Sequence, residues 1–136
     1  TPADRYAFPA EDRCVDAALA TSVFSHIPAG TAAHYLSEAG RVLRSGARIM
    51  LTAFLISGED RKALDRARLA LRPISENAYA VDPRHPERAI GFDEAIFLGW
   101  AEAAGLKVSG QIHRGDWRAG DATGGEFQDR LVLEKT

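Results

Sequence analysis

The run from Ile49 to Ile56 is apolar at every position except Thr52. A strand with one face in water alternates polar and apolar residues, whereas a continuous apolar run of this length is typical of a strand covered on both faces. Such strands occur mainly in parallel sheets that carry helices on their two sides. The run therefore predicts a central strand in an α/β domain.

A second apolar run, Val15–Thr21, has one acidic residue near its start and predicts another buried parallel strand. Between the two runs, apolar residues recur at helical spacing, which indicates an amphipathic helix. These residues are Ala32, Tyr35, Leu36, Ala39, Val42 and Leu43. Gly46 is predicted to close this helix, because glycine is favoured in the left-handed position after a helix end.

The carboxyl-terminal part of the chain predicts a helix and then a hairpin. Asp93 follows Phe92 as a helix N-cap, and Gly105 is placed to end the helix. Residues 106–113 and 126–133 both alternate, which predicts two antiparallel strands. The stretch between these strands contains Gly115, Gly120, Gly124 and Gly125.

The segment between the central strand and this second helix has no single pattern. Charged residues within 57–70 flank Leu64, Ala67 and Leu71, which predicts a solvated surface helix. Prolines and scattered polar residues within 72–88 predict a long irregular connection, with one extended piece at 78–81.

The composition is that of one ordinary globular domain without a charged partner. The 136 residues are 46% hydrophobic and 26% charged, with a net charge of −2 at pH 7. This balance offers no basic surface for nucleic acid or an anionic membrane. No apolar run reaches the roughly 20 residues that span a bilayer. We therefore expect a single domain over residues 1–136, with no nucleic-acid and no membrane partner.

The cysteine and histidine content predicts neither a disulfide nor a metal site. Cys14 is the only cysteine, so it is expected to be a buried thiol in a reducing, cytoplasmic compartment. His34, His85 and His113 lack metal-ligand spacing and are predicted to lie on the surface. The sequence also lacks a G-x-S-x-G nucleophile elbow, which argues against the hydrolases that use one.

Several stretches of the chain, taken in order, resemble segments of one known family. They are Tyr6–Asp16, Ala20–His26, Tyr35–Gly46, Ala104–Leu106 and Phe127–Asp129. They are similar to the fourth strand and its flanks, the helix before the fifth strand, the turn into the sixth strand and the start of the last strand of class I S-adenosylmethionine-dependent methyltransferases. The resemblance implies an α/β fold with a partial Rossmann-like methyltransferase sheet, in which parallel strands and a terminal antiparallel hairpin are flanked by helices.

Part of the family's cofactor machinery has no counterpart in these residues. No G-x-G-x-G turn follows a strand, and the glycines at 115–125 lie between two predicted hairpin strands. The chain begins at Thr1 rather than at an initiator methionine. We therefore expect it to be the carboxyl-terminal portion of the fold, truncated within the domain, with half of the S-adenosylmethionine site.

The resemblance implies four cofactor-binding positions and one catalytic position. Asp4 would accept a hydrogen bond from the adenine amino group, and the backbone amide of Arg5 would bond the ring nitrogen. Thr21 and Phe24 follow the first strand at its carboxyl end, where open α/β sheets bind ligands, and Phe24 would pack on the cofactor. His26 would act as general base toward a hydroxyl or amine of the methyl acceptor.

Each position also has a purely structural interpretation. Asp4 can be a solvated acid at a frayed terminus, Phe24 a core aromatic, and His26 the partner of a nearby carbonyl. Asp116 and Trp117 can line an acceptor pocket, or Trp117 can cover an edge of the core.

The sequence leaves two main functions open. The first, implied by the resemblance, is methyl transfer from S-adenosylmethionine to a small-molecule or peptide acceptor. The second is a non-catalytic dimerising or ligand-binding module derived from the same fold, and a small ligand-binding domain unrelated to the family is a third. If the strand at 15–21 lacks a neighbour, its apolar edge is a template for pairing, so we expect a homodimer through that exposed edge.

Overall fold

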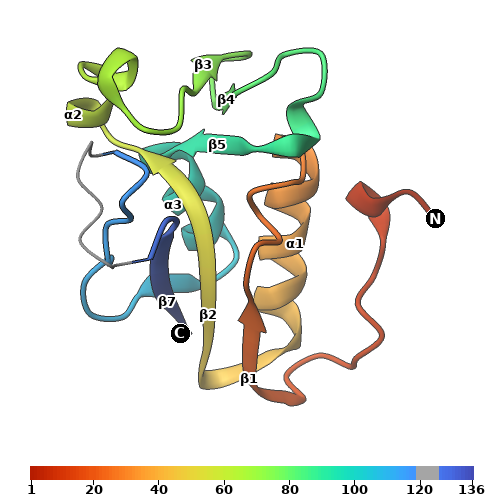
Figure 1. Cartoon of the computed structure of the whole chain (residues 1–136). Helices are drawn as coiled ribbons and strands as arrows, with labels where there is room; N and C mark the ends of the chain where they lie inside the picture. Colours follow the sequence, from red (N-terminus) through yellow and green to blue (C-terminus); the bar gives the residue numbers. More distant parts are fainter. Residues whose placement is uncertain (119–125) are drawn as a thin grey trace.

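The computed structural model describes residues 1–118 and 126–136 (Figure 1). Its helices are α1 (Ala29–Val42), α2 (Gly58–Arg61) and α3 (Glu94–Ala103), and its short 3₁₀ turns are η1 (Ala3–Arg5), η2 (Leu64–Arg66) and η3 (Pro86–Arg88). Its strands are β1 (Val15–Ala20), β2 (Leu43–Ile56), β3 (Arg72–Pro73), β4 (Ala78–Ala80), β5 (Ile90–Asp93), β6 (Leu106–Val108) and β7 (Asp129–Lys135). Gly120, Gly124 and Gly125 lie outside the described residues.

Strand β2 is the centre of a mixed sheet, as its apolar run predicts. β1 pairs with it in parallel and β7 in antiparallel direction, so that Leu51 lies between Ala20 and Leu131. Beyond the end of β1, β5 pairs in parallel with the last residues of β2. The order is β3-β4-β5-β2-β7-β6, with β1 beside β2. The predicted α/β class, with parallel strands and a terminal antiparallel hairpin, is confirmed.

Helix α1 passes directly into β2, without the predicted glycine cap. The helix ends at Val42, and Leu43 is already extended, buried and paired with Val15. Residues 44–47 then interrupt the β1–β2 ladder as a bulge, in which Gly46 has a φ of 82°. The prediction of Gly46 as helix cap is wrong, because the burial of Leu43 extends the chain before the glycine is reached.

Helices α1 and α3 contact each other and cover one face of the sheet (Figure 1). The amphipathic pattern of α1 explains this arrangement, since Leu36 and Ala39 point into the core and are buried. Ile49 and Leu51 of β2 face them from the sheet. Burial of a large aliphatic side chain such as Leu36, Ile49 or Leu51 stabilises the fold by about 1.5–3 kcal/mol.

Helix α3 begins and ends where the sequence predicts. The Asp93 side chain accepts a hydrogen bond from Ile96 N at 3.1 Å and so caps the helix. Phe92 stacks on Phe97 across the cap, with ring centroids 5.8 Å apart. Gly105, with a φ of 77°, follows the helix end.

The opposite face of the sheet is open along β1, β2 and β7. Leu19, Met50 and Val132 lie side by side there on neighbouring strands, and Leu19 is 65% exposed. Among the described residues, β1 has β2 as its only neighbour. The prediction that Val15–Thr21 is buried is therefore wrong, and the strand is the exposed apolar edge that was expected if it lacked a second neighbour. Cys14, predicted to be buried, precedes this edge strand and is exposed.

The predicted surface helix over 57–70 does not form. Only Gly58–Arg61 is α-helical, held by a capping box in which the Asp60 carboxylate accepts from Ser57 N at 2.9 Å. The chain then turns through η2, and Leu71 becomes buried in a second apolar cluster. The other buried members of this cluster are Phe54, Ile56, Tyr79 and Trp117. Tertiary packing of Leu71 therefore overrides the helical charge pattern.

The connection over 72–88, predicted to be irregular, contains two short strands. β4 confirms the predicted extended piece, and it pairs with β3 on one edge and β5 on the other. The sequence did not predict β5, which sits just before the Asp93 cap.

The terminal hairpin is confirmed, with different limits. β6 covers only Leu106–Val108 of the predicted 106–113, and His113 makes one isolated bridge to Arg130. β7 starts at Asp129 rather than at residue 126.

Asp129, at the start of β7, is a fully buried acid. Its carboxylate accepts hydrogen bonds from Leu55 N and Gly115 N, each at 2.8 Å, and from the Trp117 indole. Arg118 donates to the same carboxylate and, at 2.8 Å, to the carbonyl oxygen of Leu55. These bonds fix the turn that ends at Arg118 on the carboxyl end of β2. Trp117 is fully buried, which matches its structural interpretation.

Candidate functional site

A hollow of about 340 Å³, lined by both polar and apolar side chains, lies at the carboxyl end of β1 and beside β2 and the start of β7. Its lining residues are Thr21, Ser22, Met50, Thr52, Glu126, Phe127, Gln128 and Arg130. Open α/β sheets bind ligands outside the carboxyl ends of their strands. This hollow, which we call the β1 hollow, is therefore the candidate site.

Ser22 forms a strained turn at this site. Its φ of 56° is in the left-handed region, which is unfavourable for residues with a β carbon. Its amide donates to Thr52 Oγ1 at 2.8 Å, and its hydroxyl accepts from Gln128 Nε2 at 3.1 Å. Residues held in such conformations concentrate at functional sites. Sequence reasoning missed Ser22 and Gln128, although Thr52, the polar exception in its apolar run, was a usable signal.

Of the two residues predicted at the end of the first strand, Thr21 lines the β1 hollow and Phe24 does not. Phe24 is 2% exposed and packs edge-on against Phe97, with ring centroids 5.5 Å apart. This packing matches the structural interpretation of Phe24 as a core aromatic.

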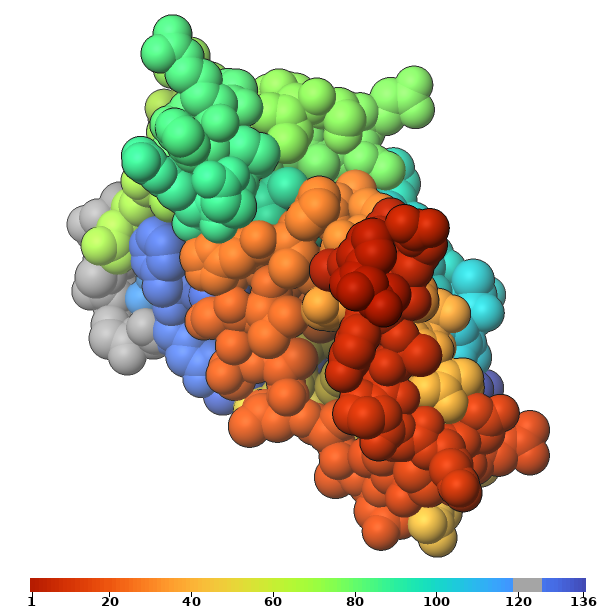
Figure 2. Space-filling view, turned by 90° about the vertical axis from the view of Figure 1, so that its right-hand side faces the viewer, coloured from red at the N-terminus to blue at the C-terminus, as the bar shows by residue number. Residues whose placement is uncertain are grey.

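Asp4 and Arg5 lie in η1, and neither lines the β1 hollow. Both residues are exposed. The backbone amide of Arg5 donates to the carbonyl oxygen of Pro2 at 3.0 Å, within the 3₁₀ turn. An arm of residues 6–12 connects η1 to β1 and crosses the surface beside α1 (Figure 2). The predicted cofactor residues are therefore divided between η1, the core and the hollow.

Two charged residues of α1 hold this arm. Glu38 Oε1 accepts a hydrogen bond from Phe8 N at 2.8 Å. Arg41 donates to Glu38 at 2.8 Å, to the carbonyl oxygen of Ala10 at 3.0 Å and to Asp12 at 2.7 Å. The hydrogen bond from Arg41 lowers the pKa of Glu38 below its ordinary value, against the opposing effect of burial.

An apolar groove of about 400 Å³ lies between the arm and β1 (Figure 2). Phe8 and Pro9 of the arm, Leu19 of β1 and Tyr35 of α1 contribute to its walls. Apart from the hydroxyl of Tyr35, its lining side chains are apolar. The groove thus offers shape and apolar surface, with few polar groups to orient a ligand.

His26 is exposed in the loop between β1 and α1. Its Nδ1 lies 2.9 Å from the carbonyl oxygen of Glu87. Because a carbonyl only accepts, Nδ1 carries the proton and Nε2 is left as the acceptor of the neutral ring. This contact matches the structural interpretation of His26, and it also leaves one ring nitrogen able to take a proton.

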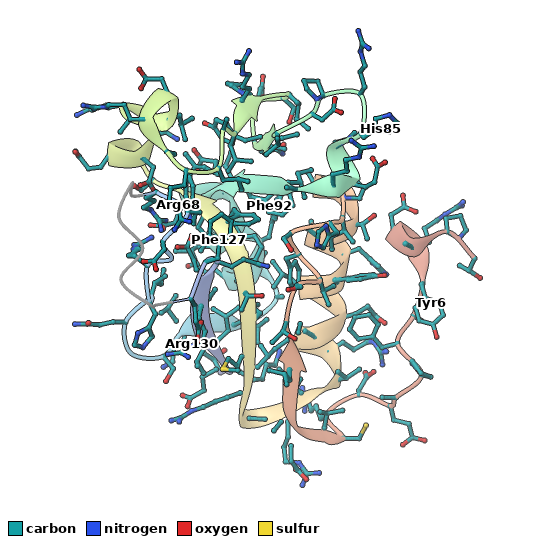
Figure 3. The ribbon with its side chains drawn as sticks, in the orientation of Figure 1. Tyr6, Arg68, His85, Phe92, Phe127 and Arg130 are labelled. Atoms are coloured by element: carbon teal, nitrogen blue, oxygen red, sulfur yellow. The ribbon has the colours of Figure 1, made fainter. Side chains whose placement is uncertain are left out.

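The remaining histidines and Asp116 do not line the β1 hollow, although backbone hydrogen bonds join His113 to Arg130 and Asp116 to Glu126 of its lining. His85 (Figure 3) and His113 are exposed, while His34 is half-buried with Nε2 2.7 Å from the carbonyl oxygen of Tyr6. Asp116 is half-buried in the turn before Trp117. In residues 1–118 and 126–136, no group of three or more His, Cys, Asp and Glu could hold a metal ion. No helix in that part of the chain is long and apolar enough to cross a membrane.

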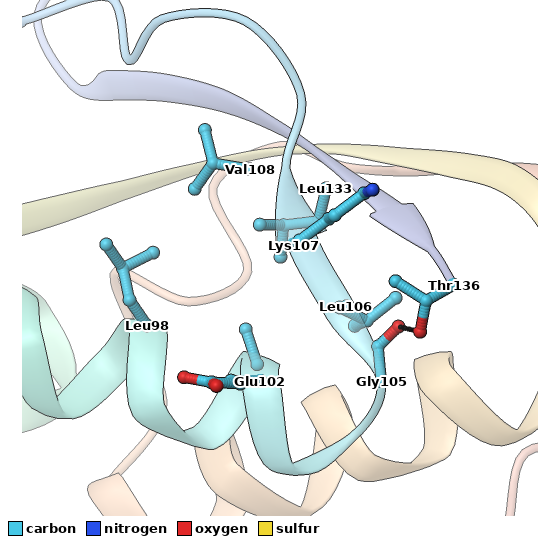
Figure 4. Close-up of a pocket in the computed structure, with 9 residues that line it drawn as sticks. Leu98, Glu102, Gly105, Leu106, Lys107, Val108, Leu133 and Thr136 are labelled. Atoms are coloured by element: carbon cyan, nitrogen blue, oxygen red, sulfur yellow. Dashed lines mark hydrogen bonds between the residues drawn. The ribbon is translucent and has the colours of Figure 1, made fainter.

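A third hollow, of about 400 Å³, lies between the end of α3 and the start of β6 (Figure 4). Leu98, Leu106 and Leu133 give it an apolar lining, with Glu102 and Lys107 as its charged residues. This end of the sheet holds the amino ends of the parallel strands, where open α/β sheets do not place their ligands. It is therefore not the candidate site.

Solved structures share this fold, although no protein-family model matches the sequence. The match with a methyltransferase of Methanosarcina mazei covers 99% of this chain and 65% of the methyltransferase's chain, with 19% sequence identity and a TM-score of 0.63. A second match is the 1,6-didemethyltoxoflavin N1-methyltransferase of Burkholderia thailandensis, which was solved with bound 1,6-didemethyltoxoflavin and S-adenosylhomocysteine. This match covers 100% of our chain and 49% of the Burkholderia chain, with 17% identity and a TM-score of 0.56. The match with a methyltransferase of Corynebacterium glutamicum covers 100% of this chain and 54% of the methyltransferase's chain, with 14% identity and a TM-score of 0.53.

The chain therefore has a class I S-adenosylmethionine-dependent methyltransferase-like fold, as the resemblance implies. It spans between 49% and 65% of the length of these solved structures. The predicted Rossmann-like sheet class is confirmed.

The hydrogen bonds by which Glu38 and Arg41 hold the arm, which we call the clamp, predict that the free energy of unfolding depends on pH. The pKa of Glu38 in the folded protein lies below the unfolded value of about 4.3. The ionised Glu38 side chain therefore stabilises the folded state above that pH, and this stabilisation is lost as the pH falls through the folded pKa. We expect Glu38→Gln to lower the free energy of unfolding by about 1–2 kcal/mol at neutral pH and by less at about pH 3, which lies below the unfolded pKa. Urea unfolding at both pH values measures it. Glu11→Gln, an exposed change in the same arm, is the control, and an equal loss at both pH values would contradict the clamp.

The contact of His26 predicts its tautomer. We expect the neutral ring to carry its proton on Nδ1, because Nδ1 faces the carbonyl of Glu87. Nitrogen NMR of the histidine rings measures which nitrogen is protonated, and exposed His113 serves as the comparison within the same spectrum. A proton found on Nε2 of His26 instead would contradict the hydrogen bond from Nδ1 to the carbonyl of Glu87, and it would leave Nε2 unable to accept a proton.

Proposed function

We propose that this chain takes part in methyl transfer from S-adenosylmethionine to a small-molecule or peptide acceptor. The observation that carries the proposal is the fold: methyltransferase structures match 99% to 100% of the chain. The Burkholderia protein was solved with S-adenosylhomocysteine and a small molecule bound. By this proposal the chain supplies the part of the fold that extends from its fourth strand to its last.

The residues present fit the cofactor in part. The exposed carboxylate of Asp4 is able to accept from an adenine amino group, and Thr21 presents its hydroxyl at the end of β1. Phe24 is packed in the core, and the amide of Arg5 is already bonded within η1. We therefore propose Asp4 and Thr21 as the cofactor contacts, and Arg5 and Phe24 as residues that support them. The bound cofactor would supply the electrophilic methyl group.

His26 is proposed as the base. Its Nδ1 is held by the carbonyl of Glu87, which fixes the ring, and its Nε2 is left to accept the proton of an acceptor hydroxyl or amine. Methyl transfer depends mainly on in-line positioning of donor and acceptor, so this proton acceptance would assist the step rather than carry it.

The test is a titration with S-adenosylhomocysteine followed by backbone NMR. We expect shifts at Asp4 and Thr21, and an affinity several-fold weaker in Asp4→Asn, because the amide loses the charged acceptor. Asp16→Asn is the matched control, since Asp16 is also an exposed acid, and it pairs with Arg44 away from Asp4 and Thr21. Absence of shifts at both residues at millimolar ligand would contradict the proposal.

A second candidate function is a non-catalytic module that forms a homodimer. The observation that favours it is the edge of β1, which has no second neighbour among the described residues and presents Leu19 at 65% exposure. An exposed apolar edge strand is a template for pairing with another chain.

Light scattering tests this candidate at micromolar concentration. We expect a dimer, and we expect Leu19→Lys to give a monomer because a charge on an edge strand opposes pairing. Val81→Lys is the control, since Val81 is also an exposed apolar residue, at 40%, away from β1. A monomeric wild-type chain would remove the candidate.

A further inference from the structure

We propose that the outer edge of β6 binds an extended segment of another protein that reads apolar, acidic, apolar. The two apolar side chains of this segment would enter the hollow between α3 and β6, which we call the β6 hollow (Figure 4). The segment would add a strand to the sheet, so that backbone hydrogen bonds give affinity and side-chain contacts give specificity. The lining residues of the β6 hollow and the β1 hollow do not overlap, and this binding is independent of methyl transfer.

Strand β6 has one side free for pairing. In the part of the chain that the structure describes, its only neighbouring strand is β7. On that side Ser109 N donates to the carbonyl oxygen of Val132 at 2.8 Å. Because the bonds of an antiparallel ladder alternate along a strand, the backbone groups of Leu106 and Val108 point away from β7. These groups are the donors and acceptors that an added strand would use.

The β6 hollow lies beside this edge, on the face of the sheet that α3 covers. Its volume is about 400 Å³, and its apolar wall consists of Leu98, Ala101, Leu106, Val108 and Leu133. Alternate residues of a strand point to the same face, so an added strand would place every second side chain against this wall. Leu98 and Val108 are only half-buried, and apolar side chains at these two positions would cover them.

Lys107 selects the residue between the two apolar positions. It lies between Leu106 and Val108 in the strand and therefore faces the open side of the sheet. Opposite it on β7 is Glu134, whose carboxylate already accepts a hydrogen bond from Arg48 Nε at 3.0 Å. Within residues 1–118 and 126–136, Lys107 has no ion-pair partner of its own. An acidic residue of the added strand would lie directly opposite Lys107, where opposite charges stabilise strand pairing.

The same lysine argues against other occupants of the edge. A lysine on an edge strand opposes pairing with strands that bring no acid. A second copy of the chain, in the register that covers both hollows, would place two Lys107 side chains opposite each other, and like charges there destabilise the pair. Glu102, on the α3 rim of the β6 hollow, repels acidic side chains from the apolar positions. The edge therefore favours an acid at one position only.

The experiment titrates the 136-residue chain with the peptide acetyl-Ser-Leu-Glu-Val-Ser-amide and follows backbone NMR shifts and amide hydrogen exchange. We expect shifts along β6 and slower exchange of the Leu106 and Val108 amides, because the added strand accepts from them. The same peptide with lysine in place of glutamate should bind about five-fold more weakly, because it meets Lys107 with a like charge. Equal binding of the two peptides, or shifts at β1 instead of β6, would overturn the proposal.

A charge reversal tests the contact with Lys107. Lys107→Glu should exchange the preference, so that the lysine peptide binds about five-fold more tightly than the glutamate peptide. Lys62→Glu makes the same change at an exposed residue outside the β6 hollow and should leave the preference as it is. A preference that stays the same in Lys107→Glu would remove the acid from the proposed segment and overturn it.

A proline tests the added strand itself. Val108→Pro removes an amide that points away from β7, a position at which edge strands tolerate proline. Val108→Ala loses the same valine side chain but keeps the amide, so it is the matched control. We expect the proline variant to bind the glutamate peptide several-fold more weakly than the alanine variant, because it lacks one hydrogen bond to the peptide. Equal binding by the two variants would rule out strand addition.

Spectra of the chain alone at increasing concentration test for a second copy. The shifts of Leu106 and Val108 should stay constant, because the proposed occupant is a segment of another protein. A concentration dependence at these two residues would assign the edge of β6 to a second copy and overturn the proposal.

Discussion

A charge buried away from water must be surrounded by hydrogen-bond donors, and Asp129 is where this requirement organises the chain. Its carboxylate accepts from Leu55 in the central strand, 74 residues away in sequence, and from the guanidinium of Arg118. Arg118 also donates to Asp60, the residue that closes the capping box of α2 with Ser57. Burial alone would raise the pKa of Asp60, but the hydrogen bonds from Arg118 and Ser57 lower it. The same ion cluster therefore fixes the start of α2, the turn before Arg118 and the first residue of β7.

This cluster also determines the shape of the β1 hollow. Phe127 and Gln128 come immediately before Asp129, so the buried carboxylate sets where two of the lining residues lie. Gly115, which donates to Asp129, leaves no room for a side chain: a β carbon there would lie 2.3 Å from the carbonyl oxygen of Phe127. The backbone at Gly115 therefore packs directly against Phe127 and Gln128, which line the hollow. A change at Gly115 or Asp129 would alter the candidate site although neither residue lines it.

How much was predictable from the sequence depended on whether a feature is local. The amphipathic helix α1, the apolar strand β2, the Asp93 cap and the final hairpin follow from patterns within one segment, and all were predicted. The missed features depend on partners distant in sequence: β5 is a strand because the end of β2 is beside it, and Leu71 ends a charged helix pattern by joining a remote cluster. Thr21 of the β1 hollow was predicted from its place after a strand, but Ser22 and Gln128 were missed because the bond between them spans 106 residues.

Thr52 joins the fold to the candidate site. Thr52 is half-buried and lines the β1 hollow, so its hydroxyl is the polar group that the apolar run of β2 offers there. The bond from Ser22 N satisfies it, and the same bond holds Ser22 in a left-handed turn whose strain, about 1–3 kcal/mol, would otherwise relax. A valine at this position would preserve the strand and release the turn. The one exception to the apolar pattern that predicts the central strand is therefore the residue through which that strand shapes the hollow.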